Sequence, residues 1–323
     1  MLYSILQSFV KVGLQWYVTD WQLAKLNQVD FKRPTLIVSN HPNSFFDAVI
    51  IAALAPTKIC FLARGDVFNK PLANWALRTF FMLPIYKRYD DTESHVKNAF
   101  TYDDCVRQLN EGVSIFIFPE GISRNQFKLG PFMPVGVTSI ITRAIQMDVP
   151  IQIQPYLIGY NSFNQLPKTV ALETLQPIDC TDYIQNGEVQ TATILHKLKN
   201  SMLAAATGRA SEPTPSLTKS NQWMRIPALI GGLTHNWYYQ LIKKKVQTKT
   251  QGTIFFDSLL FGILLFSYPV IVLVLGIILG SILGFWWGVF VFILFPALSY
   301  CWVHYHKIET DQQEEEGRVN VLN

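Results

Sequence analysis

Residues 258–305 contain no Asp, Glu, Lys or Arg, and this uncharged run constrains the fold more than any other feature of the chain. A helix that spans a membrane needs about 20 apolar residues, so the run is long enough for two passes. Gly280 and Ser281, near its middle, provide a turn between them. The sequence therefore predicts a two-helix transmembrane hairpin over residues 253–306. The alternative is a helical hairpin buried inside a soluble domain.

The charges around this run indicate which side of the membrane its ends occupy. A hairpin returns both ends to the same side, and basic residues are enriched in cytoplasmic loops. We therefore expect a protein of the inner (cytoplasmic) membrane whose remaining part faces the cytoplasm. The basic residues come from residues 208–252, a linker with a basic and aromatic helix, and from residues 307–323, a polar tail. They are Lys243, Lys244, Lys245, Lys249 and Lys307.

The first 17 residues have the pattern of an amphipathic helix. Gln7, Lys11 and Gln15 lie on one side of this helix, and most of the other positions are apolar. The segment has no basic start and no small-residue cleavage site, so it does not have the pattern of a cleavable signal peptide. We expect residues 1–29 to associate with the membrane surface. Packing against a protein core is the alternative.

Short apolar runs alternate with helical patterns between residues 30 and 207. This alternation is typical of an α/β domain, in which helices pack on the faces of a sheet. A segment rich in Pro, Ser and Thr, residues 208–216, marks the end of the domain. The expected strands are residues 35–38, 58–62, 113–118 and 149–155, and the expected helices are residues 48–54, 94–109, 134–146 and 183–205.

The overall composition excludes some classes of function. The net charge of +4 is too mild to favour a nucleic-acid-binding protein. The four cysteines, Cys60, Cys105, Cys180 and Cys301, lack the spacing of metal ligands and of a disulfide framework. We therefore expect reduced thiols and no bound metal.

His41 and Asp47 form the strongest candidate for catalysis. His41 follows an apolar strand, and Asp47 lies one helical turn further along the chain. A carboxylate at this position can fix the tautomer of the imidazole, which then acts as a general base. The pattern has a structural explanation too. Ser44 would cap the next helix, Asp47 would lie favourably in the first turn of that helix, and His41 would satisfy a backbone group.

A second candidate follows the most apolar strand of the domain. Glu120 and Gly121 lie directly after residues 113–118, at the carboxyl edge of the sheet, where α/β proteins place ligands. Ser123 and Lys128 follow in the same loop. The alternative is an ordinary turn between a strand and a loop.

A third candidate is the adjacent pair Lys87 and Arg88, which ends a short extended stretch from residue 82. Neighbouring side chains on a strand point to opposite faces, so one of the two can reach a ligand and bind phosphate. A solvated surface pair is the alternative.

These motifs, in this order, resemble the glycerophospholipid acyltransferase superfamily, which contains the PlsC-type lysophosphatidate acyltransferases and the glycerol-phosphate acyltransferases. The resemblance covers residues 30–165. It rests on His41 with Asp47, on residues 83–88, on residues 118–121 and on the apolar strand at residues 149–155. It implies a mixed sheet with helices on both faces over residues 30–207, as the catalytic domain.

The chain departs from the family pattern at three places. Five residues separate His41 from Asp47, one more than is usual. Lys87 aligns best with the arginine of the second motif, with Arg88 one position later. Met133 stands where many members have lysine, and the resemblance leaves Lys128 as the candidate to replace that lysine.

The resemblance implies transfer of an acyl chain from acyl-CoA or an acyl-carrier-protein thioester to a hydroxyl of glycerol 3-phosphate or 1-acylglycerol 3-phosphate. His41 would be the base, Asp47 would orient it, Lys87 or Arg88 would hold the phosphate and Glu120 the glycerol hydroxyls. Ser123 and Lys128 would line the acceptor site, and backbone N–H groups near Gly121 would stabilise the oxyanion. The thioester is already activated, so neither a metal, nor a cofactor, nor an acyl-enzyme is needed. The partners are the phospholipid membrane and these substrates.

Other functions remain open on the sequence. The acceptor could be lyso-ornithine lipid or another lysolipid, because the shape of the acceptor pocket decides this choice. An inactive membrane scaffold of the same fold is an alternative of another class. A soluble hydrolase is disfavoured, since the Gly-x-Ser-x-Gly nucleophile motif is missing.

Overall fold

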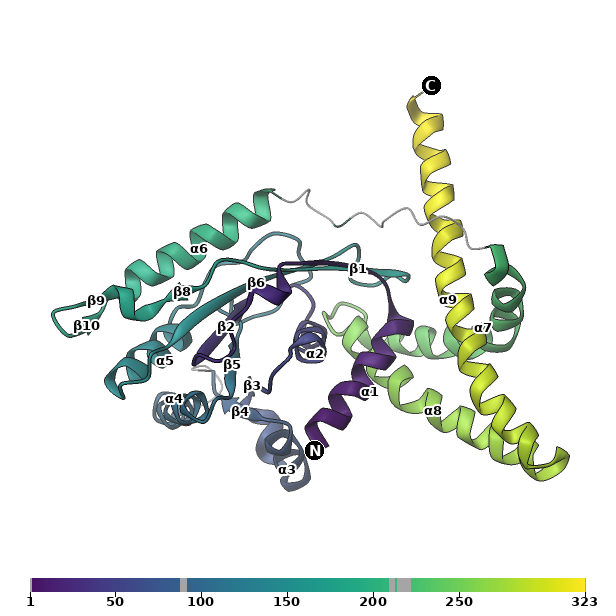
Figure 1. Ribbon diagram of the computed structural model, residues 1–323, viewed down its shortest axis with the longest axis horizontal. Coiled ribbons are helices and arrows are strands. Elements are labelled where there is room, and N and C mark those ends of the chain that lie inside the picture. The colour runs from purple at the N-terminus through teal and green to yellow at the C-terminus, as the bar shows by residue number, and fades with distance from the viewer. Residues whose placement is uncertain (1, 88–91, 209–212, 214–221, 323) are drawn as a thin grey trace. The chain divides into compact units, whose positions relative to one another are not determined.

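The computed structural model describes residues 2–87, 92–208, 213 and 222–322 (Figure 1). The chain forms two compact units that interleave along the sequence. The first unit consists of Met1–Gln7, Gln22–Gly159 and Ala171–Glu212, and the second of Ser8–Trp21, Tyr160–Val170 and Pro213–Asn323. The predicted boundary at residues 208–216 falls mainly outside the described residues, so the predicted domain limits stay predictions.

An eight-stranded sheet organises the fold. Its strand order is β1-β7-β6-β2-β5-β3-β4, and β8 pairs with β6. The block β6-β2-β5-β3-β4 is parallel, whereas β8 is antiparallel to β6, so the predicted mixed sheet is confirmed. The strands are β1 (Val18–Ala24), β2 (Thr35–Ser39), β3 (Ile59–Arg64), β4 (Met82–Ile85), β5 (Ser114–Ile117), β6 (Gln152–Tyr160), β7 (Lys168–Thr174) and β8 (Ile178–Asp179).

Helices cover both faces of the parallel block. Leu36 and Val38 of β2 point to one face, where they join the core formed with helices α4, α5 and α6. Ile37 points to the other face, which α2 covers with its buried residues (Figure 1). The helices of this unit are α2 (Phe45–Leu54), α3 (Pro71–Thr79), α4 (Ser94–Asn110), α5 (Val135–Gln146) and α6 (Thr191–Gly208).

The second unit contains the predicted helical hairpin. Helices α8 (Phe256–Leu283) and α9 (Phe285–Leu322) follow α7 (Arg225–Thr250). The turn of the hairpin falls at Gly284, not at the predicted Gly280 and Ser281, because the helical hydrogen bonds of α8 continue to its last apolar residues. Phe256–Leu283 and Phe285–Tyr305 are long and apolar enough to cross a membrane. In their most apolar windows only 11% and 22% of the residues are buried, which is unlike a hairpin hidden in a soluble core.

Three other segments differ from the sequence prediction. The predicted N-terminal helix is confirmed as α1 (Leu2–Tyr17), but the chain then enters β1 instead of remaining outside the sheet. The helix predicted from residue 183 begins at Thr191, after a 3₁₀ turn (Cys180–Tyr183) and a two-stranded hairpin. The hairpin consists of β9 (Ile184–Gln185) and β10 (Glu188–Val189) around the Asn186-Gly187 turn, which favours positive φ.

Candidate functional site

The structure brings His41 and Asp47 together. His41 lies just beyond the end of β2, and Asp47 lies in the first turn of α2. The distance between His41 Nδ1 and Asp47 Oδ2 is 2.9 Å. The Asp47 side chain is fully buried, whereas the imidazole is 16% exposed. With Nδ1 directed to the carboxylate, Nε2 is the ring nitrogen that can meet a substrate hydroxyl.

Backbone and ring contacts hold this pair in place. Asp47 Oδ2 also accepts the N–H of Asn43 at 2.8 Å, which fixes the carboxylate relative to the loop between β2 and α2. The imidazole stacks on the ring of Phe118, with 3.6 Å between the ring centroids and 11° between the planes. Phe118 in turn meets Phe116 edge to face. The stacking function of Phe118 was not predicted, although the residue belongs to a predicted motif.

Asn40 anchors the end of β2 to its neighbour. Its side-chain amide donates to the carbonyl of Ile158 and accepts the N–H of Ile158, both at 2.8 Å. These two bonds continue the pairing of β2 and β6 beyond Ser39, where the backbone ladder ends. The position of His41 is therefore set by the sheet.

Glu120 connects the two principal motifs. One carboxylate oxygen accepts the N–H of His41 at 3.1 Å, and the other accepts the N–H of Gly130 at 3.0 Å. The side chain is only 3% exposed, and burial raises the pKa of Glu120 although both of these hydrogen bonds lower it. The predicted contact of Glu120 with glycerol hydroxyls stays a prediction. In the structure Glu120 positions His41.

Ser123 supports the unusual backbone of Ser44. Its hydroxyl oxygen accepts the N–H of Ser44 at 2.7 Å, and both residues are buried. Ser44 adopts φ 53° and ψ −143°, close to a region that glycine alone occupies readily. It makes no side-chain cap for α2, so the predicted capping role of Ser44 is wrong. The Ser123 hydroxyl thus holds the loop that carries Asp47. Its predicted place in the acceptor site stays a prediction.

Gly121 forms a turn, and its N–H is paired within the backbone. It has φ +65° and donates its N–H to the carbonyl of Phe118 at 3.1 Å. A Cβ atom on Gly121 would lie 2.6 Å from Met133 Sδ, so a larger residue would displace Met133. The N–H of Gly121 itself is therefore already bonded. Stabilisation of the oxyanion by other N–H groups near Gly121 stays a prediction.

Of the predicted cations, Lys87 lies apart from His41 along the sheet. Lys87 follows β4, which is three strand spacings from β2, or roughly 14 Å at about 4.8 Å per spacing. Its side chain is exposed, as is that of Lys128, whereas Arg88 lies outside the described residues. Arg64, which was not predicted, ends β3 one spacing closer and pairs with Asp66 at 2.7 Å. All these strand ends lie at the same carboxyl edge, since β2, β5, β3 and β4 are parallel.

The arrangement can perform general-base chemistry. A buried carboxylate and an oriented, partly exposed imidazole are the groups needed to remove a proton from an alcohol. The stacking on Phe118 and the contact with Asp47 restrict rotation of the imidazole. The bonds of Glu120 and Asn40 fix the backbone that carries it. Such restriction favours reaction because the geometry is prepared before the substrate binds.

Comparison with known proteins agrees with this chemistry. Residues 20–158 match the family model described as Acyltransferase. The chain is 30% identical over 139 residues to a 1-acyl-sn-glycerol-3-phosphate acyltransferase of Brassica napus, which covers 43% of this chain and 38% of the relative. It is 30% identical over 129 residues to a lyso-ornithine lipid O-acyltransferase of Pseudomonas aeruginosa, which covers 40% of this chain and 44% of that relative. The matches therefore span less than half the length of either relative.

A solved structure is also similar. The crystal structure of the 1-acyl-sn-glycerophosphate acyltransferase PlsC from Thermotoga maritima is 17% identical in sequence. The match has a TM-score of 0.47 and covers 64% of this chain and 78% of that protein.

Proposed function

We propose that this chain is a membrane-bound O-acyltransferase. The proposal starts from the premise that residues 20–158 form a domain of the glycerophospholipid acyltransferase superfamily. The acyl donor is a thioester of coenzyme A or of acyl carrier protein. The acceptor is a hydroxyl of 1-acylglycerol 3-phosphate or glycerol 3-phosphate. The observation that carries the proposal is the 2.9 Å contact between His41 Nδ1 and the fully buried carboxylate of Asp47.

The reaction needs one proton to move twice. As the acceptor hydroxyl attacks the thioester carbonyl, His41 Nε2 takes its proton and the new C–O bond forms. Asp47 stabilises the resulting imidazolium. The tetrahedral intermediate then expels the thiolate as the C–S bond breaks, and the thiolate takes the proton from His41. Neither a covalent acyl-enzyme nor an external oxidant or reductant enters this balance.

The membrane parts support a lipid acceptor. A lysolipid and its diacyl product stay in the bilayer, so the reacting edge of the sheet must meet the membrane surface. The two apolar spans and α1 would keep it there. Lysines at residues 243–245, Lys249 and Lys307 favour a cytoplasmic position for the catalytic domain.

Lyso-ornithine lipid is the second candidate acceptor. The relative from Pseudomonas aeruginosa carries that substrate in its name, and it has the same 30% identity to this chain as the lysophosphatidate enzyme, over a slightly shorter stretch. An acceptor without phosphate would not require Lys87 or another phosphate-binding cation. This difference can be tested because Lys87 is exposed and can be replaced without loss of a buried contact.

The test is an assay of purified membranes that contain the full chain. Glycerol 3-phosphate, 1-acylglycerol 3-phosphate and lyso-ornithine lipid are each paired with acyl-CoA and with the carrier-protein thioester. We expect one pair to yield product at a rate that His41→Ala lowers by at least about 100-fold, the lower end of general-base contributions. His196→Ala, on the exposed face of α6, is the matched control and should retain full activity. Transfer by no pair would favour the inactive scaffold, whereas equal transfer by His41→Ala would mean that His41 is not the general base.

A further inference from the structure

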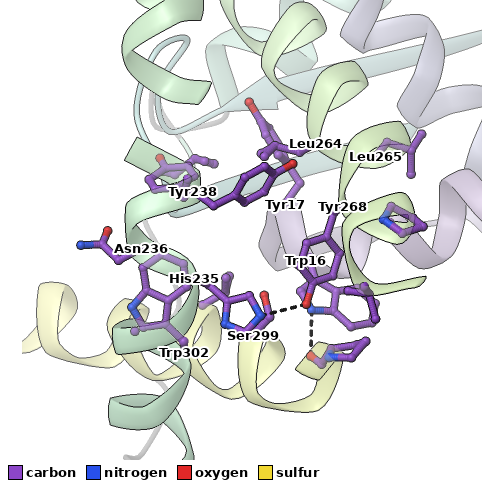
Figure 2. Close-up of a pocket in the computed structure, with 18 of the residues that line it drawn as sticks. Trp16, Tyr17, His235, Asn236, Tyr238, Leu264, Leu265, Tyr268, Ser299 and Trp302 are labelled. Carbon is purple, nitrogen blue, oxygen red and sulfur yellow. Dashed lines mark hydrogen bonds between the residues drawn. The ribbon is translucent and has the colours of Figure 1, made fainter. Parts of the chain in front are cut away.

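The second unit contains a large cavity that the catalytic proposal does not use. Its volume is about 1220 Å³, and its lining residues come from α1, α7, α8, α9 and residues 166–167 (Figure 2). All of these residues belong to the second unit. Pockets for ordinary small molecules measure about 300–1,000 Å³, so this cavity is large enough for a lipid-sized ligand.

Apolar and aromatic side chains dominate one part of the lining. Leu264 and Leu265 of α8 and Trp16 of α1 all line the cavity (Figure 2), and the indole N–H of Trp16 donates to the carbonyl of Pro296 at 3.3 Å. Hydrocarbon chains are the natural occupants of such a surface, since burial of apolar area is the main source of affinity there.

The polar groups deep in the cavity are already paired and contribute no charge. His235 lies in the middle of α7, and its Nε2 is 3.0 Å from the hydroxyl of Tyr268 on α8 (Figure 2). Its Nδ1 lies 2.9 Å from the carbonyl of Gly231. The side chain is only 3% exposed, and burial lowers the pKa of His235, so the imidazole is neutral near pH 7. A charged head group has no partner at this depth.

Lys243 supplies the one charge among the described residues of the lining. It lies two turns beyond His235 on α7, and its Nζ is 5.6 Å from the ring centroid of Tyr239. Lys244 and Lys245 follow it and are exposed. The cavity therefore combines an apolar body with a single cationic end, which matches an amphiphile with one negative charge.

We propose that this cavity binds one anionic glycerophospholipid of the surrounding bilayer. The phosphate lies at Lys243, and an acyl chain lies along Leu264 and Leu265. A lining with a single cation disfavours acyl-CoA, whose several phosphates would require more than one. The bound lipid stabilises the packing of α7 against the hairpin and does not take part in acyl transfer.

Native mass spectrometry of the full chain, released from detergent, tests this assignment. Phosphatidylglycerol and phosphatidylcholine with identical acyl chains are the two probes. We expect one phosphatidylglycerol to be retained per chain and to bind about tenfold more tightly than phosphatidylcholine, which corresponds to about 1.4 kcal/mol. Lys243→Gln should remove this preference, and the matched Lys244→Gln should keep it. His41→Ala should bind lipid as the wild type does, so the result is independent of the catalytic proposal.

A second pair of variants tests the place of the acyl chain. Leu264→Trp fills the cavity and should reduce retention of the lipid at least tenfold. Ile277→Trp, on the same helix but 60% exposed and outside the lining, should have no effect. If Leu264→Trp does not fold, Lys243→Gln alone decides, because it disturbs no buried packing. Equal retention of the two lipids, or a preference that survives Lys243→Gln, would overturn the proposal.

Discussion

Two aspartates, one in each unit, are equally buried but have different kinds of partner. Asp47 and Asp257 both have fully buried side chains. Asp257 accepts from Lys168 Nζ and from the hydroxyl of Tyr17, each at 2.7 Å, and these partners are themselves buried. Asp47 instead meets His41, whose ring is 16% exposed.

The difference between the partners decides the role of each carboxylate. In a buried ion pair with no exposed member, each charge compensates the other where water does not reach, so removal of one partner is costly. In the second unit this pair joins α8 to α1 and to the start of β7. In the first unit His41 reaches the surface, so its imidazole can exchange a proton with a substrate. Burial of a carboxylate alone therefore does not separate the proposed catalytic pair from the structural one, whereas the exposure of the partner does.

The largest expected effect on activity follows from Asp47→Asn. The amide preserves the size of the side chain but cannot stabilise the imidazolium as a carboxylate does. We expect kcat to fall about 100-fold or more, because the residue contributes through the general base. Asp103→Asn, an exposed aspartate on α4, is the control. Retention of more than half of the wild-type kcat by Asp47→Asn would remove the distinction between the two aspartates.

Whereas Asp47→Asn should lower the activity, Lys168→Met should lower the stability of the fold. It leaves Asp257 buried without its cation, which typically costs about 3–5 kcal/mol. Adding Asp257→Leu should recover most of this loss, since no uncompensated charge then remains. Thermal unfolding in a mild detergent measures both changes. Lys25→Met, which breaks an exposed pair with Glu173, should cost less than about 1 kcal/mol. A double variant as unstable as Lys168→Met alone would contradict this account of the buried pair.

A smaller gain of stability is expected from Ser44→Gly. Ser44 has a backbone conformation that costs about 1–3 kcal/mol in a residue with a side chain. Glycine adopts it without strain, so we expect the free energy of unfolding to rise by about 1 kcal/mol. Ser39→Gly, in the regular backbone of β2, should instead destabilise the chain. Destabilisation by Ser44→Gly would show that this loop is not strained.

The smallest expected effect concerns the pH dependence of stability. Burial raises the pKa of Glu120 above its ordinary value of 4.5, so the folded chain holds this proton more tightly than the unfolded chain. The resulting stability is present below pH 4.5 and is lost as the pH rises through the raised pKa. Glu120→Gln should lack this component. The free energy of unfolding of the wild type relative to Glu120→Gln should therefore decrease from pH 4.5 toward neutrality, and parallel profiles would contradict the raised pKa.

The sequence predicted the features that depend on neighbouring residues. The contact of His41 with Asp47 follows from a strand end and the first turn of the next helix, and both are visible as local patterns. Most expected strands and helices in residues 30–160 were confirmed for the same reason. The apolar hairpin was also predicted, because length and absence of charge suffice to recognise it.

Features that depend on distant residues were not predicted. The roles of Ser123 and Glu120 rest on bonds to Ser44 and His41, each 79 positions away in the chain. No local pattern reveals such a pairing. The strand β7 and its Lys168 were missed because a lysine at a strand start normally indicates exposure, whereas here Asp257 compensates its charge. The turn at Gly284 was misplaced because several glycines in the apolar run fit a turn equally well.

A double-variant cycle on acyl transfer tests the central claim most directly. The rates of wild type, His41→Ala, Asp47→Asn and the double variant are measured with the acceptor that gives the highest rate. If Asp47 acts only by orienting and stabilising His41, Asp47→Asn should lower the rate of the wild type about 100-fold or more and leave the rate of His41→Ala almost unchanged. An equal loss in both backgrounds would mean that Asp47 acts independently of His41, and the account would be wrong.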